Sequence, residues 1–197
     1  MQAKSGSSTT RQRLLTTASE LFLKDGINAT GIAAIAAHAG VTKMTLYAYF
    51  SSKDELIVAF LEQRNERWNT AVGSTLAGIA HPAEKLLSLF DLYRDWLVKG
   101  GLRGCAYVNC SAEFPDRSHP VRLAVARHKQ SVRSHLKMLA ESAGLINAEV
   151  IAQRLFLLLE GAFLTGALEN DDRVFFIARE LADELINAAL VGRLSLN

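Results

Sequence analysis

The chain has 197 residues, 49% of them hydrophobic, and a formal net charge of +2. This is enough to bury a substantial core, in one domain or two small ones. No apolar run approaches the roughly 18 residues of a membrane span, and no signal peptide opens the chain. Two cysteines do not make a disulfide framework. We therefore expect a cytoplasmic protein without a membrane partner.

The N-terminal segment predicts a tail followed by a helix. Residues 1–8 are small and polar, and we expect them to be disordered. Thr9 or Thr10 can cap a first helix with a regular apolar stripe, and Gly26 closes it.

Two short helical patterns joined by a glycine come next. From Thr30 onward the apolar residues fall on one narrow helical face, and Thr30 is placed to cap this helix. Gly40 then interrupts the pattern, since glycine readily takes the positive φ that reverses chain direction. Thr42 can cap a second helix, with Leu46 and Phe50 turned inward. Two short helices joined by a tight, glycine-containing turn indicate a helix-turn-helix.

The outward face of the second short helix is small and flat. At about 100° per residue, Met44 and Ala48 point away from Leu46 and Phe50. Such a face fits the major groove of DNA, where Met44 and Ala48 would contact thymine methyls and Lys43 would donate to guanine acceptors. Thr45 is also expected to contribute to the choice of sequence, whereas Thr30, Tyr47, Tyr49 and Lys53 would contact phosphates. The residues expected to bind DNA are Thr30, Thr42, Lys43, Met44, Thr45, Tyr47, Ala48, Tyr49 and Lys53.

This segment resembles the DNA-binding domain of the tetracycline-repressor (TetR) family of bacterial regulators. The matching residues, over about a quarter of the chain, are Thr30, Ile35-Ala36, Ala39-Gly40-Val41, Thr45-Leu46-Tyr47, Tyr49-Phe50 and Ser52-Lys53. Met44 stands where the family usually has glycine, and Tyr49 where histidine is common. The first departure alters the base-facing surface, so the resemblance does not carry over an operator sequence.

Positive charge is concentrated in the first part of the chain. Up to Lys53 there are six Lys and Arg against two acidic residues, whereas the remainder has sixteen against eighteen. This asymmetry suits contact with phosphates, although chance also produces asymmetries of this size. Arg11 and Arg13 are candidates for phosphate contact, or alternatively are solvated charges at the end of a helix.

The rest of the chain reads as helices without any alternating strand pattern. Ser52 to Glu55 resembles a capping box at the start of a long helix. We predict an all-α protein in which residues 9–53 form a helix-turn-helix domain. The long helix joins it to a helical effector-binding and dimerisation domain at 54–197. The later helices are expected at 83–98, 104–113, 121–142, 150–168 and 174–194.

The last two of these helices have apolar residues on more than one face, which indicates burial on several sides. Paired with their symmetry mates, they would form a four-helix dimer interface, an arrangement that the family resemblance also implies. The alternative is an ordinary monomer core. The residues predicted at the interface are Leu155, Leu158, Ala162, Thr165, Phe175, Ala178, Leu181 and Leu185.

A small-molecule site requires an apolar cavity with a few polar groups that orient the ligand. Glu160 interrupts a run of leucines, and a buried carboxylate needs a partner, for which Arg127, His128 or Arg154 are candidates. The alternative is a salt bridge of Glu160 across the dimer interface. The residues predicted to bind the effector are Phe90, Tyr93, Trp96, Tyr107, Asn109, Phe114, Phe156, Glu160 and Phe163.

We therefore predict a ligand-responsive dimeric regulator, most simply a repressor, that binds a palindromic operator in double-stranded DNA. One alternative is a thiol-sensing regulator or an enzyme that uses Cys105 or Cys110. Five residues apart on a helix, these two differ by about 140° in direction, which disfavours a direct disulfide. A second alternative is a helical module that binds a protein or small molecule without a DNA role. No metal-ligand spacing, cofactor motif or enzyme signature is found.

Overall fold

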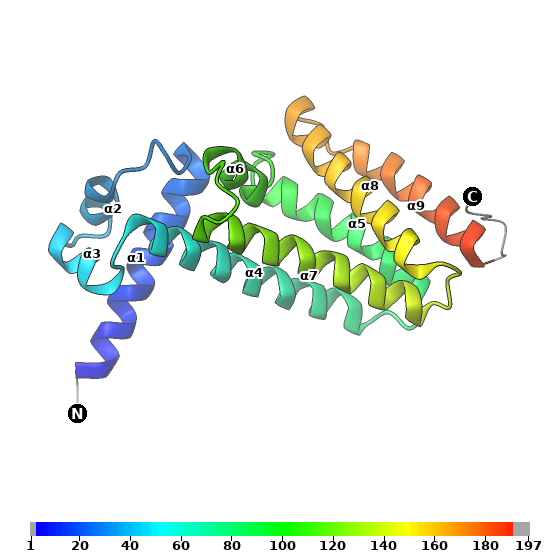
Figure 1. Cartoon of the computed structure of the whole chain (residues 1–197), viewed down its shortest axis with the longest axis horizontal. Helices are drawn as coiled ribbons and strands as arrows, with labels where there is room; N and C mark the ends of the chain where they lie inside the picture. Colours follow the sequence, from blue (N-terminus) through cyan, green and yellow to red (C-terminus); the bar gives the residue numbers. More distant parts are fainter. Residues whose placement is uncertain (1–2, 191–197) are drawn as a thin grey trace. The chain divides into compact units, whose positions relative to one another are not determined.

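The computed structural model describes residues 3–190, with side chains from Thr9 onward. Over this range the chain forms nine α-helices and no strand, so the predicted all-α class is confirmed (Figure 1). The helices are α1 (Ala3–Asp25), α2 (Ile32–His38), α3 (Lys43–Tyr49), α4 (Lys53–Ala77), α5 (Pro82–Lys99), α6 (Ala106–Glu113), α7 (Pro120–Ser142), α8 (Ala148–Glu169) and α9 (Val174–Leu190).

The described residues divide into two compact units. The first contains the chain up to Glu66 together with Ala106–Ala126, and the second contains Arg67–Cys105 and the chain from Arg127 onward. Helices α4 and α7 therefore each contribute residues to both units, whereas α6 belongs wholly to the first. The assignment of residues 9–53 to DNA binding and 54–197 to effector binding stays a prediction about function.

The first helix begins earlier than predicted. It starts at Ala3, before the predicted cap at Thr9 or Thr10, so part of the segment expected as a tail is assigned to the helix, and residues 1 and 2 lie outside the described part. No proline interrupts this segment, and a helix nucleated farther along the chain extends at little cost. Thr9 is therefore an interior residue of α1 and not its cap. The helix ends as predicted, at Gly26, whose φ is +90°.

The core of the first unit comes mainly from α1, α2, α3 and the first turns of α4. The rings of Phe22 and Phe60 meet edge to face, 5.6 Å apart. Such pairs add to the free energy gained by burying apolar area. The side chains that are fully or almost fully buried include Leu14, Ala18, Ile35, Leu46, Phe50, Leu56 and Ile57.

The core of the second unit is built around α5, α8 and α9, with aromatic rings at its centre. Tyr93 contacts Trp68 on one side, at 4.6 Å between ring centroids, and Phe163 on the other, at 5.8 Å. Phe163 in turn meets Phe175 of α9 at 6.2 Å. Each of these pairs is edge to face, so the core is a connected chain of rings.

Helix α8 is long and apolar enough, by length and composition, to cross a membrane. The expectation that no stretch reaches this threshold was therefore too strict. The finding is weak evidence for a span, because the core helices of soluble proteins pass the same test. In addition, Glu160 in the middle of α8 is ion-paired with Lys129, and a charged pair is unfavourable in lipid.

Candidate nucleic-acid interface

Helices α2 and α3 form the predicted helix-turn-helix, packed beside α1 (Figure 1). Helix α2 buries Ile35 and Ala36. Gly40 has a φ of +64°, a value that residues with a Cβ rarely adopt. The N–H of Val41 then donates to the carbonyl of Ala36 at 3.0 Å, which closes the turn. The change of direction between the helices therefore depends on glycine at this position.

Thr42 caps α3 as predicted. Its Oγ1 accepts a hydrogen bond from the N–H of Thr45 at 3.1 Å. The two threonine hydroxyls also lie 2.9 Å apart. The bond fixes the start of α3 because it satisfies an N–H that has no partner within the helix.

The outward face of α3 is the one expected from the sequence. Leu46 and Phe50 are fully buried beneath the helix, whereas Met44 is 84% exposed and Tyr47 50% exposed. Lys43 and Ala48 are exposed as well. Met44 and Tyr47 therefore lie on a face of α3 that no described residue covers.

Thr30 has a different role from the one predicted. The cap of α2 is Gly31, while Thr30 is only 3% exposed and its hydroxyl donates to the carbonyl of Gly26 at 2.7 Å. The sequence interpretation failed because a threonine at a helix start can also bond backward to the preceding turn. A phosphate contact from this hydroxyl would require that internal bond to break.

Lys53 is also engaged inside the protein. Its Nζ donates to the carbonyl oxygen of Ile27 at 2.6 Å, so the ammonium holds the turn between α1 and α2. Thr45 and Tyr49 are half-buried and Thr42 is exposed. Of the nine predicted DNA-contacting residues, the exposed ones therefore gather on α3 and its cap.

The start of α4 is fixed by a modified capping box. The N–H of Glu55 donates to Oγ of Ser52 at 3.1 Å, as the pattern predicts. The carboxylate of Glu55 accepts from the hydroxyl and the N–H of Ser51, both at 2.6 Å, and not from Ser52. These bonds stabilise the ionised form, so the pKa of Glu55 is held below its ordinary value, first by the Ser51 hydroxyl and then by its N–H.

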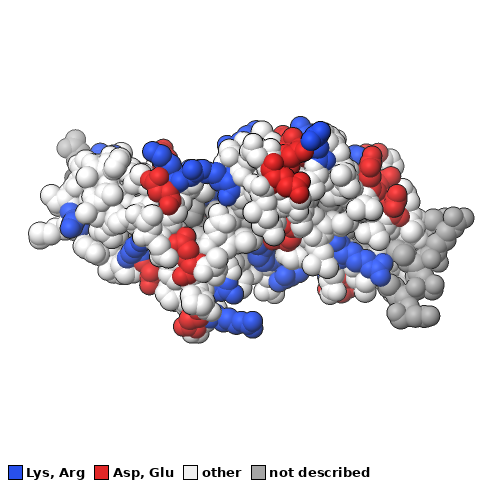
Figure 2. All heavy atoms as spheres, turned by 90° about the horizontal axis from the view of Figure 1, so that it is seen from above, with Lys and Arg blue, Asp and Glu red and all other residues white. Residues whose placement is uncertain are grey.

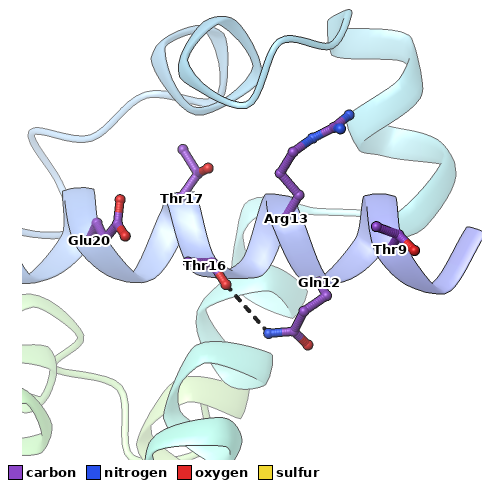
Figure 3. A pocket seen from close by; sticks show the side chains of 6 residues that line it. All are labelled: Thr9, Gln12, Arg13, Thr16, Thr17 and Glu20. Carbon is purple, nitrogen blue, oxygen red and sulfur yellow. Dashed lines mark hydrogen bonds between the residues drawn. The ribbon is translucent and has the colours of Figure 1, made fainter. Parts of the chain in front are cut away.

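The two arginines of α1 have different surroundings. The guanidinium of Arg11 lies over the ring of Phe50, 4.8 Å from its centroid, and therefore packs against the unit itself. Arg13 borders an open hollow of about 650 Å³ together with Thr17, and the two extend from one side of α1 (Figure 3). Gln12 and Thr16 extend from the other side and are joined by a hydrogen bond of 3.4 Å.

Charge does not form one continuous basic field on the face drawn in Figure 2, where acidic and basic side chains alternate. Any steering of DNA would depend on the local cations of α1 and α3.

The structure does not gather the nine predicted effector-binding residues in one compact unit. Tyr107, Asn109 and Phe114 belong to the first unit, where the Tyr107 hydroxyl donates to the carbonyl of Leu61 at 3.0 Å. The six in the second unit are Phe90, Tyr93, Trp96, Phe156, Glu160 and Phe163. Phe90, Tyr93 and Phe163 are buried in its core, because aromatic residues at helical spacing serve packing as readily as binding.

Glu160 has a partner that the sequence interpretation missed. Its two oxygens lie 2.6 and 2.7 Å from Nζ of Lys129. The Lys129 and Glu160 side chains are 13% and 23% exposed. The sequence does not specify which face of α7 meets α8, so it did not distinguish Lys129 from its neighbours Arg127 and His128. Arg154, the third candidate, lies on α8 itself. The Cys105 sulfur also lies 3.5 Å from Nζ of Lys129.

The predicted dimer-interface residues divide by exposure. Four of them are buried in the core of their own unit, as the alternative reading proposed: Leu155, Ala162, Phe175 and Ala178. Leu158, Thr165 and Leu185 are half-buried, and Leu181 is 43% exposed. The helices are apolar on several faces, as predicted, and the predicted residues that are buried pack within their own unit. The dimer interface itself stays a prediction.

A partly different set of residues, which includes the predicted Leu181, leaves an apolar surface uncovered on these helices. On α8, Leu157, Gly161, Leu164 and Leu168 recur at helical spacing and are all exposed, Leu168 by 77%. On α9, Ile177 is exposed by 60% and lies one turn before Leu181. We call these six residues the α8–α9 stripe.

A helix-turn-helix with an uncovered second helix, followed by a helical region, defines a DNA-binding regulator. Comparison with known proteins supports the assignment to DNA-binding regulators. Residues 14–60 match the model of bacterial regulatory proteins of the tetR family, and residues 82–182 match a tetracyclin repressor-like C-terminal domain. The chain belongs to the TetR family and is a DNA-binding transcriptional regulator.

Several relatives show how far the likeness extends. The chain is 28% identical over 135 residues to the transcriptional repressor NemR of Escherichia coli K12, which covers 68% of each chain. It is 34% identical over 87 residues to the transcriptional activator FasR of Mycolicibacterium smegmatis, over 44% of this chain and 40% of FasR. The TetR-family regulator SCO4454 of Streptomyces coelicolor has a TM-score of 0.87 and 31% identity, covering 92% of this chain and 96% of that one.

Proposed function

We propose that the chain is a cytoplasmic homodimeric repressor that binds a palindromic operator and releases it when a small molecule binds. The observation that carries the DNA contact is the face of α3, where Met44 is 84% exposed above a fully buried Leu46. Repression rather than activation is supported by the name of NemR, which is similar to this chain over the larger share of its length.

The sequence-reading residues of this proposal are Lys43, Met44, Thr45 and Ala48. Met44 and Ala48 supply apolar contacts to thymine methyls, and Lys43 supplies donors to guanine. Tyr47 and Tyr49 supply hydroxyls for phosphates at the edges of α3. Thr30 and Lys53 support the geometry, given their bonds to Gly26 and Ile27.

The DNA contact is tested by selecting duplexes from a random pool with the purified chain and measuring affinity at several salt concentrations. We expect the logarithm of the binding constant to fall linearly with the logarithm of salt, by about 0.9 per phosphate contacted. Failure to enrich any duplex, with no salt-dependent binding, would contradict the proposal.

Replacing Lys43 by alanine should relax the base preference at one position in each half-site. A base contact of this kind contributes about 1–3 kcal/mol of discrimination. The measurement is repetition of the selection with the variant, and Lys99→Ala is the matched control, since Lys99 is an exposed lysine of the second unit. A loss of equal size on every sequence would identify Lys43 as a phosphate contact instead.

The effector site of the proposal lies in the second unit. Support comes from the ion pair Lys129–Glu160, whose side chains are 13% and 23% exposed, and from the half-buried Phe156 one helical turn before Glu160 on α8. An effector that favours the form unable to bind DNA lowers operator affinity by its differential affinity for the two forms. Titration of a compound library against a labelled selected duplex tests this.

A further inference from the structure

The turn between α1 and α2 is held by charged side chains from two other helices. Glu113, the last residue of α6, accepts the N–H of Asn28 at 2.6 Å and the N–H of Ile27 at 3.3 Å, one on each carboxylate oxygen. From α4, Lys53 donates to the carbonyl of Ile27 at 2.6 Å. All of these residues belong to the first compact unit.

The carboxylate suits this position because it offers only acceptors. Two oxygens of one ionised group meet two consecutive backbone N–H groups, and hydrogen bonds to an ionised partner are stronger than neutral ones. Ile27 is 3% exposed, so its N–H has few alternative partners in water, whereas Asn28 is exposed. The α1–α2 turn determines where α2 begins. Helix α2 is connected to α3 by the turn at Gly40, so the position of α3 depends on the α1–α2 turn as well.

Helix α6 is itself fastened within the first unit, so it can act as a firm support. The Tyr107 hydroxyl donates to the carbonyl of Leu61 on α4. His119, after α6, lies 3.2 Å from the carboxylate of Asp54 at the start of α4 and stacks on Phe114. Glu113 is therefore presented to the turn from a segment attached at both of its ends.

Glu113 lies in the part of the sequence assigned to the C-terminal domain, although its contacts are with the helix-turn-helix unit. Residues 106–126 lie inside the stretch that matches the C-terminal domain model of the family, yet they belong to the compact unit of the helix-turn-helix. Helix α7 continues from this segment past Ala126 into the second unit, where Lys129 resides. The chain thus runs directly from the α6–α7 segment to the proposed effector region.

We propose that Glu113 is a positioning residue for DNA binding: its carboxylate fixes the α1–α2 turn and holds α3 in the orientation that reads DNA. This rests on the proposed function, in that α3 must contact DNA for the position of the turn to matter. Displacement of α6 would release Ile27 and Asn28 and lower operator affinity without any change in the DNA-contacting residues.

The test compares Glu113→Ala and Glu113→Gln in the full-length protein on one duplex selected by the wild type. Glutamine keeps one acceptor oxygen but places an NH₂ donor against the second N–H. We expect Glu113→Ala to lose about tenfold in affinity, within the usual range for coupled sites, and Glu113→Gln to lose less. Glu149→Gln, at an exposed pair with Lys137 in the second unit, should bind like the wild type.

Amide hydrogen exchange separates positioning from loss of structure. In support of the proposal, exchange would quicken at residues 26–30 while the amides of the α1 and α4 cores keep their protection. Wild-type affinity in Glu113→Ala would overturn the proposal, as would affinity lost together with protection throughout the first unit. If the wild type itself selects no duplex, the DNA-binding function fails first and the role of Glu113 fails with it.

Discussion

Replacing Lys129 by methionine is expected to lower the free energy of unfolding by about 1–3 kcal/mol, because it leaves the partly buried Glu160 carboxylate without its partner. Both side chains are largely buried, at 13% and 23% exposure, and both carboxylate oxygens contact the ammonium. The measurement is urea unfolding followed by circular dichroism at one fixed protein concentration, since the proposed dimerisation would make stability depend on concentration.

Two further variants show whether the burial of the pair is responsible. In the double variant Lys129→Met with Glu160→Leu, apolar groups replace both charges, and most of the lost stability should return. Lys137→Met is the matched control, because Lys137 pairs with Glu149 at the surface, where ion pairs contribute little. Its unfolding curve should overlie that of the wild type. Equal losses in Lys129→Met and Lys137→Met would contradict the argument.

Introducing glutamate at Leu164 is expected to separate the proposed dimer. Leu164 lies within the α8–α9 stripe and is 52% exposed, so the charge disturbs no core of its own unit. In a two-fold interface every substitution appears twice, and a charge buried there without a partner is costly. The variant should sediment as a monomer at concentrations where the wild type is a dimer.

DNA binding should fall with dimerisation, since two linked helix-turn-helix units bind two half-sites with an effective-concentration gain of about 10²–10⁴. Met138→Glu is the control: Met138 is an apolar residue of α7 with 53% exposure and lies outside the stripe. Sedimentation of Leu164→Glu as an intact dimer would place the interface elsewhere.

Much of the fold was predictable because local signals agreed with tertiary structure. The glycine at position 40, the threonine cap at 42 and the buried pair Leu46 and Phe50 all specify the same turn and helix, and the structure confirms each. Helix α5 begins at Pro82, one residue before the expected start, because proline is favoured at the first position of a helix. By contrast, the start of α1 was missed, because no sharp signal opposes extension of a helix through small polar residues.

The functional residues were less predictable where a side chain had two chemically reasonable partners. Thr30 and Lys53 have the chemistry of phosphate contacts, yet their nearest acceptors are carbonyls of the α1–α2 turn. Glu113 carried no signal in the sequence, because its partners are backbone groups 85 and 86 residues away. Pairings at that separation follow from the packing of helices, which periodicity alone does not determine.

The membership of Ala106–Ala126 in the first compact unit limits how these regulators can be recombined. Consider a chimaera that joins the first 66 residues of this chain to the remainder of another family member. It would keep the donors Ile27 and Asn28 but lose their acceptor, Glu113. It would likewise separate Leu61 from Tyr107. We expect a transplanted helix-turn-helix region to bind DNA only when the segment Ala106–Ala126 is transferred with it as a second insert.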